Sequence, residues 1–188
     1  EKIAAVISER TKFAAVGLVS NVLGRRNPVE KIIKMVHEKG GVVLVDAAQA
    51  VLHETVDVTV LDADFLAFSG HKMLAPMGIG VLYGKEALLE KMPPFLSGGE
   101  MIESVTRESA VYAELPHKFE AGTVNGAGAV GLAAAIDYIS EIGMDTIQKR
   151  ERELEKLLFD GMSQIPYVHI LGSAKPEEHG GILSFVVD

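Results

Sequence analysis

Cysteine is absent from this sequence of 188 residues. Without it the chain can form no disulfide and no thiolate metal site, and it offers no cysteine nucleophile. The absence fits a reducing compartment, so we expect a cytoplasmic protein.

Basic residues are in the minority, with 18 Lys and Arg against 26 Asp and Glu, a formal charge of −8. A nucleic-acid-binding protein needs a basic face to neutralise phosphates, so nucleic acid is not an expected partner. No apolar run approaches the roughly 20 residues that cross a bilayer. The first ten residues also lack the basic-then-apolar pattern of a secretory signal, and we expect no membrane partner.

Motifs for metals and nucleotides are also lacking. No histidine has another at i+3 or i+4, so no metal site is predicted. There is no G-x-x-x-x-G-K-[ST] loop and no G-x-G-x-x-G after a strand, which makes a dinucleotide-binding oxidoreductase a weak alternative. The histidines considered are His37, His53, His71, His117, His169 and His179.

Hydrophobic residues make up 48% of the chain and charged residues 23%, enough apolar material for a core and too much for a disordered chain. The continuous apolar run 13–19 is typical of a buried strand, and apolar residues at helical spacing follow from Pro28. Buried strands are also predicted at 42–45, 65–68 and 79–83. The pattern predicts an α/β fold with a mostly parallel central sheet and helices on both faces.

The second half has fewer strand signals. A short helix is predicted over 85–92, and residues 95–125 have no period and are predicted to be a long functional loop. Helices follow over 126–142 and from about Asp145, and strands are expected near 167–171 and 182–187. A composition shift at 164–166 predicts a larger domain, 1–164, and the start of a second, 165–188.

Asp46 is the first candidate functional residue, because it directly follows the apolar strand VVLV. Ligands of open α/β sheets bind at the carboxyl ends of strands. Gln49 follows three residues later, among alanines that would let a flat ligand approach the backbone. The alternative is an Asp that caps the next turn.

Ser69, His71 and Lys72 form the second candidate, again directly after an apolar strand. A lysine between apolar segments is poorly hydrated, which suits the nucleophilic amine that Schiff-base chemistry requires. Ser69 and His71 can both donate to an anion. The alternative is an ordinary solvated loop.

Thr123 opens the approach to the helix at Gly126, where a hydroxyl and free amides suit phosphate. On this evidence alone a simple helix N-cap is the favoured explanation. Asn21 ends the first strand and faces the same sheet edge.

These pieces together closely resemble the class V aminotransferase family of pyridoxal-phosphate enzymes, and within it the cysteine desulfurases and selenocysteine lyases. The motif FSGHK is specific to the class, and GGEMI and KFEAGT narrow the resemblance to the SufS-like desulfurase branch. The matching segments are VSNVLG (19–24), VLVDAAQA (43–50), DFLAFSGHK (64–72), GIGVLYGK (78–85), GGEMI (98–102) and AELPHKFEAGT (113–123).

The resemblance implies a fold-type I transferase, with most of the large domain and the start of the small one. It implies pyridoxal 5'-phosphate as cofactor, with Lys72 as the Schiff-base lysine and Asp46 as the partner of the pyridine nitrogen. Gln49 matches the residue that bonds the ring's phenolic oxygen. Ser69 and His71 match phosphate donors.

Two further positions follow from the resemblance. Thr123 matches a phosphate contact supplied by the second subunit, which implies a homodimer with shared sites. Asn21 matches a position near the substrate carboxylate.

The implied reaction removes sulfur from L-cysteine, giving L-alanine and an enzyme persulfide for iron-sulfur cluster assembly, with a sulfur-acceptor protein as partner. The family's ring-stacking histidine, persulfide cysteine and carboxylate-binding arginine have no counterpart here, so we expect the central part of a longer protein. The alternatives are a selenocysteine lyase, an aminotransferase for another amino acid, and an inactive scaffold that keeps the fold.

Overall fold

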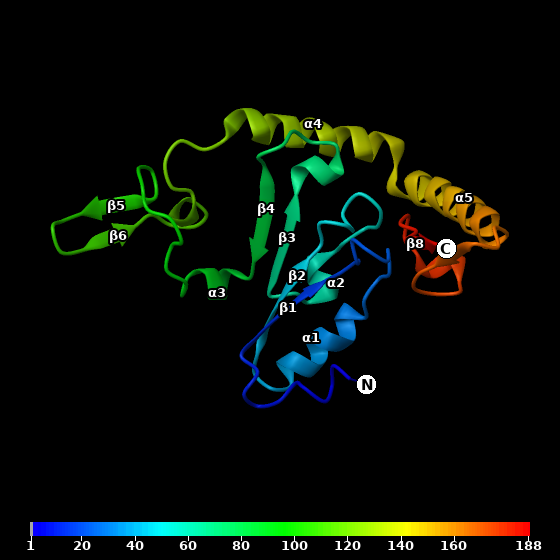
Figure 1. The fold of residues 1–188 in the computed structure, drawn as a ribbon. Coiled ribbons are helices and arrows are strands. Elements are labelled where there is room, and N and C mark those ends of the chain that lie inside the picture. Colours follow the sequence, from blue (N-terminus) through cyan, green and yellow to red (C-terminus); the bar gives the residue numbers. More distant parts are fainter. Residues whose placement is uncertain (1) are drawn as a thin grey trace.

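The computed structural model describes residues 2–188 (Figure 1). Its strands are β1 (Phe13–Gly17), β2 (Val42–Asp46), β3 (Phe65–Ser69), β4 (Gly80–Gly84), β5 (Ile102–Val105), β6 (Ala110–Tyr112), β7 (Val168–Ile170) and β8 (Phe185–Val187). Its α-helices are α1 (Val29–His37), α2 (Val58–Leu61), α3 (Glu86–Leu89), α4 (Gly126–Ile142) and α5 (Met144–Ser163). Short 3₁₀ helices are η1 (Gly70–Met73), η2 (His117–Phe119) and η3 (Pro176–Glu178).

The central sheet has the strand order β1-β2-β3-β4. The first three strands are parallel, and β4 runs antiparallel to β3. Helix α1 connects β1 to β2, so the predicted strand–helix–strand unit is present. The α/β class with a mostly parallel sheet is confirmed. Because β1, β2 and β3 share a direction, their carboxyl ends meet at one edge.

One face of the sheet packs on α1. Val43 and Val45 of β2 are fully buried, and so are Val29 and Val36 of the helix. Alternate residues of a strand point to opposite faces, so these valines define the covered face. Fully burying one such side chain stabilises the fold by about 1.5–3 kcal/mol. This contact is the main core of the domain.

The opposite face is less covered. Asp46, Ala67 and Leu82 are in-register neighbours across β2, β3 and β4, and Leu82 is 57% exposed. At the far end of this face, a Cβ on Gly84 would meet Leu89 of α3 at 2.7 Å, so α3 lies against that corner. Helices therefore contact both faces, and the face that carries Asp46 is the more open.

Helices α4 and α5 form an arm over the carboxyl edge of the sheet (Figure 1). Leu132 and Ala135 of α4 pack against Met73 of η1. Gly143, with φ of +85°, separates the helices. Within residues 2–188 no single helix is long and apolar enough to cross a membrane; α4 and α5 qualify only together, and they meet at a bend of 75°.

Two local predictions are wrong. The helix expected over 85–92 is the four-residue α3, because residues 90–92 turn ahead of Pro93. The stretch 95–125, expected to be a loop, contains the β5–β6 hairpin, which projects away from the sheet (Figure 1). The predicted domain boundary at 164–166 falls between α5 and β7.

Candidate functional site

The last residue of β2, Asp46, lies at the carboxyl edge of the sheet between its in-register neighbours Gly17 and Ala67. Its side chain is exposed, and Oδ1 accepts a hydrogen bond of 2.9 Å from the Ala48 backbone N–H. Asp46 therefore does cap the following turn, which was the alternative interpretation. That contact engages one carboxylate oxygen, and no other hydrogen bond to this side chain occurs within residues 2–188.

The residues after Asp46 form a turn with little bulk. Ala47 and Ala50 are fully buried, and the Ala47 N–H donates to the Ala67 carbonyl at 2.9 Å. Gln49 is half-buried and faces a pocket. The small side chains anchor the turn in the core while leaving Asp46 and Gln49 accessible at the sheet edge.

The end of β3 leads directly into η1, which carries the second group of candidate residues. Gly70 is required here, because a Cβ would lie 2.7 Å from Ile79 Cγ2 and 3.0 Å from the Ile79 carbonyl oxygen. The Gly70 N–H also donates to that carbonyl at 2.9 Å. This close approach fixes the backbone that presents Ser69, His71 and Lys72.

Ser69 Oγ and His71 Nδ1 lie 2.7 Å apart, so the two predicted anion donors form one hydrogen-bonded pair. Lys72 is half-buried beside the buried Met73. In the part of the chain that the structure describes, Lys72 Nζ makes no hydrogen bond or ion pair. A lysine amine at a strand end and without an internal partner is available to a ligand.

Asp46 and Lys72 thus follow two neighbouring parallel strands at the same edge of the sheet. The β2–β3 register pairs Asp46 with Ala67, five positions before Lys72. The fold therefore presents a carboxylate and an amine at the same edge of the sheet.

Asn21 is exposed in the turn after β1, between Val19 and Arg26, which form an isolated bridge. The Ser20 N–H donates to the Arg25 carbonyl at 2.9 Å and closes this turn. Asn21 therefore lies on the loop that follows the carboxyl end of β1. Asp46 and Ser69 are the last residues of the neighbouring strands β2 and β3.

Thr123 is exposed on the segment between η2 and α4, and no hydrogen bond within residues 2–188 joins it to Ser69 or His71. The expected capping role at α4 belongs to Asn125 instead. Its Oδ1 accepts from the Gly128 N–H at 2.9 Å, and its Nδ2 donates to the Gly78 carbonyl at 3.0 Å.

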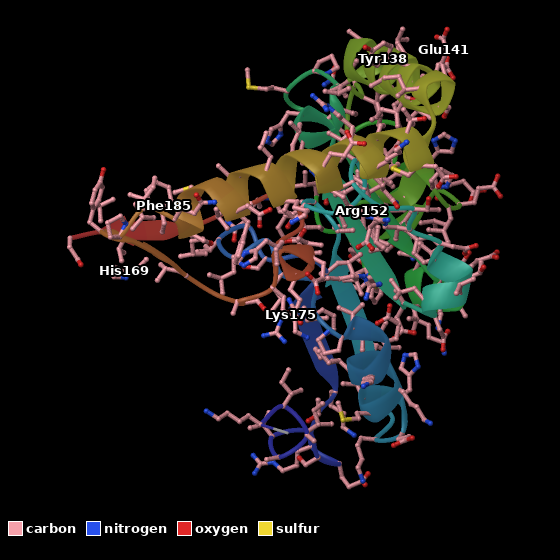
Figure 2. All side chains as sticks on the ribbon, turned by 90° about the vertical axis from the view of Figure 1, so that its right-hand side faces the viewer. Tyr138, Glu141, Arg152, His169, Lys175 and Phe185 are labelled. Atoms are coloured by element: carbon pink, nitrogen blue, oxygen red, sulfur yellow. The ribbon has the colours of Figure 1, made fainter. Side chains whose placement is uncertain are left out.

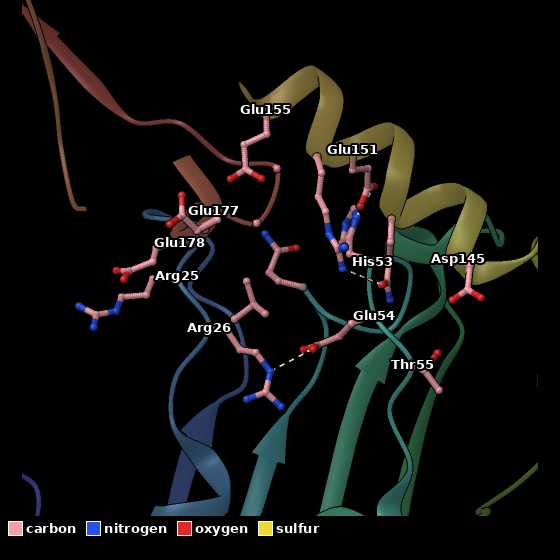
Figure 3. A pocket seen from close by; sticks show the side chains of 17 residues that line it. Arg25, Arg26, His53, Glu54, Thr55, Asp145, Glu151, Glu155, Glu177 and Glu178 are labelled. Carbon is pink, nitrogen blue, oxygen red and sulfur yellow. Dashed lines mark hydrogen bonds and ion pairs between the residues drawn. The ribbon is translucent and has the colours of Figure 1, made fainter. Parts of the chain in front are cut away.

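A pocket of about 740 Å³ opens beside Gln49 (Figure 3). Arg26 comes from the loop after β1, His53 and Glu54 from the loop after β2, and Glu151 from α5. His53 Nδ1 lies 2.6 Å from Glu151 Oε1, and Arg26 Nε donates to Glu54 Oε2 at 3.0 Å. These pairs connect the strand-end loops with each other and with α5.

Two side chains that line this pocket, Arg26 and Glu155, have shifted pKa values. Hydrogen bonding to Glu30 raises the pKa of Arg26, with burial acting the other way and Glu54 adding to the rise. Burial raises the pKa of Glu155, on α5, and the nearby backbone amides of Gly181 and His179 partly offset that effect.

No motif in the sequence marks Arg26, His53 or Glu54 as site residues. The signal that was available is the pair His53-Glu54, only four residues after Gln49 on the same strand-end loop.

Comparison with known proteins extends over the whole chain. The profile of the family "Aminotransferase class-V" matches residues 1–188. A probable cysteine desulfurase from Streptomyces coelicolor is 51% identical over 182 residues, 97% of this chain and 44% of the relative. A cysteine desulfurase from Enterobacter sp. is 46% identical over 186 residues, 98% of this chain and 45% of the relative. The chain thus spans less than half the length of these relatives.

Solved structures of two cysteine desulfurases and a C–S lyase are similar in fold to this chain. The cysteine desulfurase CsdA from Escherichia coli superposes with a TM-score of 0.91 at 38% identity, over 97% of this chain and 45% of CsdA. The apo cysteine desulfurase from Thermococcus onnurineus gives 0.89 at 43% identity, over 94% and 44%. The cystine C-S lyase C-DES, in complex with cysteine persulfide, gives 0.87 at 27% identity, over 99% and 50%.

Proposed function

The chain belongs to the class V aminotransferase family, and from that premise we propose that it forms the cofactor-binding core of a pyridoxal-phosphate-dependent cysteine desulfurase. The observation that carries the proposal is the position of Asp46 at the carboxyl end of β2 and of Lys72 on η1, which directly follows the carboxyl end of the adjacent parallel strand β3. Relatives at 45–51% identity that carry the desulfurase name support the choice of reaction.

The side chains at the sheet edge fit this cofactor in their chemistry. A carboxylate, Asp46, suits a protonated pyridine nitrogen, and an amine without an internal partner, Lys72, suits an aldehyde. The Gln49 amide can donate to a phenolic oxygen. The hydrogen-bonded pair of Ser69 and His71 can donate to a phosphate.

When bound, pyridoxal phosphate supplies an electron sink for the pair released at the substrate Cα. Asp46 would hold a proton at the ring nitrogen. Lys72 Nζ would bind the cofactor aldehyde and would be the base that accepts the proton from the substrate Cα and returns protons to the carbon skeleton. Asn21 orients the substrate through its carboxylate.

The net reaction converts L-cysteine and a thiol into L-alanine and a persulfide. The C–S bond of cysteine breaks and an S–S bond forms on the acceptor sulfur. Because the 188 residues hold no cysteine, the acceptor thiol comes from outside them.

The finer features of the proposal are a SufS-like enzyme, a role in iron-sulfur cluster assembly with a sulfur-acceptor protein, and a cytoplasmic location. A homodimer is also part of it, with Thr123 reaching the phosphate in the partner subunit's site. Its support is that Thr123 is exposed and lies on the same segment as the β5–β6 hairpin, which projects from the sheet. The proposal also includes the predicted division of the chain at 164–166 into a large and a small domain.

The test is the product spectrum of the holoenzyme at its natural length, given L-cysteine and a dithiol reductant. We expect L-alanine and sulfide in equal amounts. Pyruvate and ammonia in place of alanine would contradict the desulfurase reaction in favour of a C–S lyase. Turnover of selenocysteine but not cysteine would show a selenocysteine lyase.

A further inference from the structure

The segment of residues 172–184 near the C-terminal end lies against the loop of residues 19–26, which carries Asn21. Ser184 Oγ donates a hydrogen bond to the Val22 carbonyl oxygen. A Cβ on Gly24 would overlap the His179 carbonyl oxygen. The two backbones therefore touch at a place that leaves no room for a side chain.

Two other glycines close the contact. A Cβ on Gly180 would lie 2.6 Å from the Gly24 carbonyl oxygen. A Cβ on Gly172 would lie 3.3 Å from His179 Cε1 and 3.7 Å from Leu23 Cδ2. We call this contact between residues 172–184 and residues 19–26 the clamp. Movement of either segment moves the other, because they meet at backbone distance.

His179 is the centre of the clamp. Its side chain is buried, with 1% of the residue exposed, and Nε2 donates to the Ser173 carbonyl at 2.8 Å. The ring lies 5.5 Å from that of Phe159 on α5. The Ile182 N–H donates to the His179 carbonyl at 3.1 Å. Removing the imidazole would leave a cavity and an unpaired, half-buried carbonyl, so the segment would lose its shape.

The clamped loop has its own turn. The Gly24 N–H donates to the Ser20 carbonyl at 3.0 Å, and the Leu23 N–H donates to Ser20 Oγ at 3.1 Å. Asn21 lies within this turn and is exposed. Its position is therefore set by the turn, and the turn is supported from the outside by the clamp.

We propose that His179 and Ser184 are positioning residues, which hold Asn21 in place for the substrate carboxylate through the clamp. This inference rests on the proposed function, because the role of Asn21 belongs to it. Neither His179 nor Ser184 touches substrate or cofactor. A loosened loop must be ordered when the substrate binds, so losing the clamp weakens binding more than it slows the chemical step.

The first test is a comparison of His179→Ala and Ser184→Ala in the holoenzyme at its natural length. We expect KM for L-cysteine to rise about tenfold and about threefold respectively, with kcat within about twofold and the cofactor absorbance unchanged. His179→Gln, whose amide can still donate to the Ser173 carbonyl, should recover most of the KM loss. A fall in kcat at unchanged KM would overturn the proposal.

The matched control is His169→Ala, another histidine near the C-terminal end. Its Nε2 lies 2.7 Å from Asp188 Oδ2, and both side chains are more than half exposed. Figure 2 shows His169 on β7 close to Phe185 of β8, away from the central sheet. We expect this variant to keep both KM and kcat. A KM change equal to that of His179→Ala would show a general effect of the segment and contradict the clamp.

Hydrogen exchange tests the clamp without any turnover. In His179→Ala, the amides of Leu23 and Gly24 should exchange about tenfold faster, while those of β2 keep their rates. Unchanged exchange at Leu23 and Gly24 overturns the clamp. If wild type makes no alanine from cysteine, the proposed function fails, and the exchange rates still decide whether the clamp exists. If His179→Ala does not fold, the same two measurements, KM for L-cysteine and amide exchange at Leu23 and Gly24, are made on Ser184→Ala and decide the question.

Discussion

The two edges of the central sheet both carry charged side chains, but Asp64 at one edge and Asp46 and Lys72 at the other differ in the number of their internal partners. At the edge where β2 and β3 begin, His37, Asp62, Asp64 and Lys85 pair with one another. At the edge where these strands end, the Asp46 carboxylate accepts one backbone hydrogen bond. The Lys72 amine makes no hydrogen bond or ion pair within residues 2–188. Charged groups that satisfy one another hold the strands together, and those left without internal partners are available for a ligand.

The paired edge centres on Asp64, which is 5% exposed. Its Oδ2 accepts from His37 Nε2 and from the Val43 N–H, both at 2.7 Å, and its Oδ1 lies 3.0 Å from Lys85 Nζ. The contacts join the end of α1, the start of β2 and the end of β4. A buried carboxylate is tolerated here because both of its oxygens have hydrogen-bond or ion-pair partners.

The largest expected difference between the edges is in catalysis, from Lys72→Ala. Turnover should fall by about 10³-fold or more, because the proton transfer at the substrate Cα loses its base. The free energy of unfolding should change by less than about 1 kcal/mol, since the amine has no internal partner. Steady-state kinetics and urea unfolding measure the two quantities. Substantial residual turnover would remove Lys72 from the site.

Asp64→Ala should show the reverse pattern. We expect a loss of about 3 kcal/mol in the free energy of unfolding, because His37 and Lys85 lose their buried partner and the Val43 N–H its acceptor. The fraction that remains folded should bind the cofactor normally, as judged by its absorbance. A stable protein with altered absorbance would contradict the division between the two edges.

Asp46→Asn tests the open edge again, with a smaller effect. The amide oxygen can still accept from the Ala48 N–H, so the turn is kept and the charge alone is lost. Turnover should fall by about 10²-fold, because the ring nitrogen is no longer held protonated. The cofactor should remain bound, as measured by absorbance after gel filtration. Wild-type turnover in this variant would refute the role of Asp46.

The paired edge also predicts a dependence of stability on acid. Burial acts to raise the pKa of Asp64, but hydrogen bonds from His37, Lys85 and the Val43 amide outweigh it and leave the pKa below its ordinary value. A folded-state pKa below the unfolded one means that the unfolded chain binds the proton more tightly. The stabilisation is therefore present above about pH 4 and is lost as the pH falls through the folded-state value.

Urea unfolding of wild type and Asp64→Asn across pH 2–7 measures this dependence. The difference in stability between the two proteins should shrink as the pH falls below about 4 and Asp64 becomes protonated. A difference that stays constant down to pH 2 would show that the Asp64 charge does not matter.

The smallest effect is expected from an exposed ion pair, which belongs to neither edge. Arg150 Nη1 lies 3.2 Å from Glu153 Oε2 on α5, with both side chains more than half exposed. Arg150→Ala should change the free energy of unfolding by less than about 0.5 kcal/mol and leave turnover unaltered. A larger loss of stability would mean that exposed pairs matter as much as the buried Asp64 network.

The strands and helices of the core were predictable because their apolar residues are continuous or periodic. The run VVLV and the helix 126–142 appear as β2 with one added residue and as α4 with the same bounds. The β5–β6 hairpin was missed, because its strands are short and exposed on both faces and so show no alternation. The paired edge was missed because its four residues come from three separate segments and meet only in the folded sheet.

The strand ends that carry the candidate site residues were predictable, and the contacts of these residues only in part. Asp46 and Ser69 directly follow apolar runs and Lys72 comes three residues after Ser69, so the sequence alone places them at or just beyond strand ends. The hydrogen bond between Ser69 and His71 depends on the turn of η1, which no pattern in the sequence indicates. The clamp depends on glycines far apart in the chain, and only the fold brings them together.

The most direct test of the central claim is reduction of the holoenzyme with borohydride, followed by peptide mapping by mass spectrometry. The account predicts a stable pyridoxyl group on Lys72 and on no other lysine, and its loss in Lys72→Ala. A pyridoxyl group on a different lysine, or none on any peptide of a protein saturated with cofactor, would contradict it.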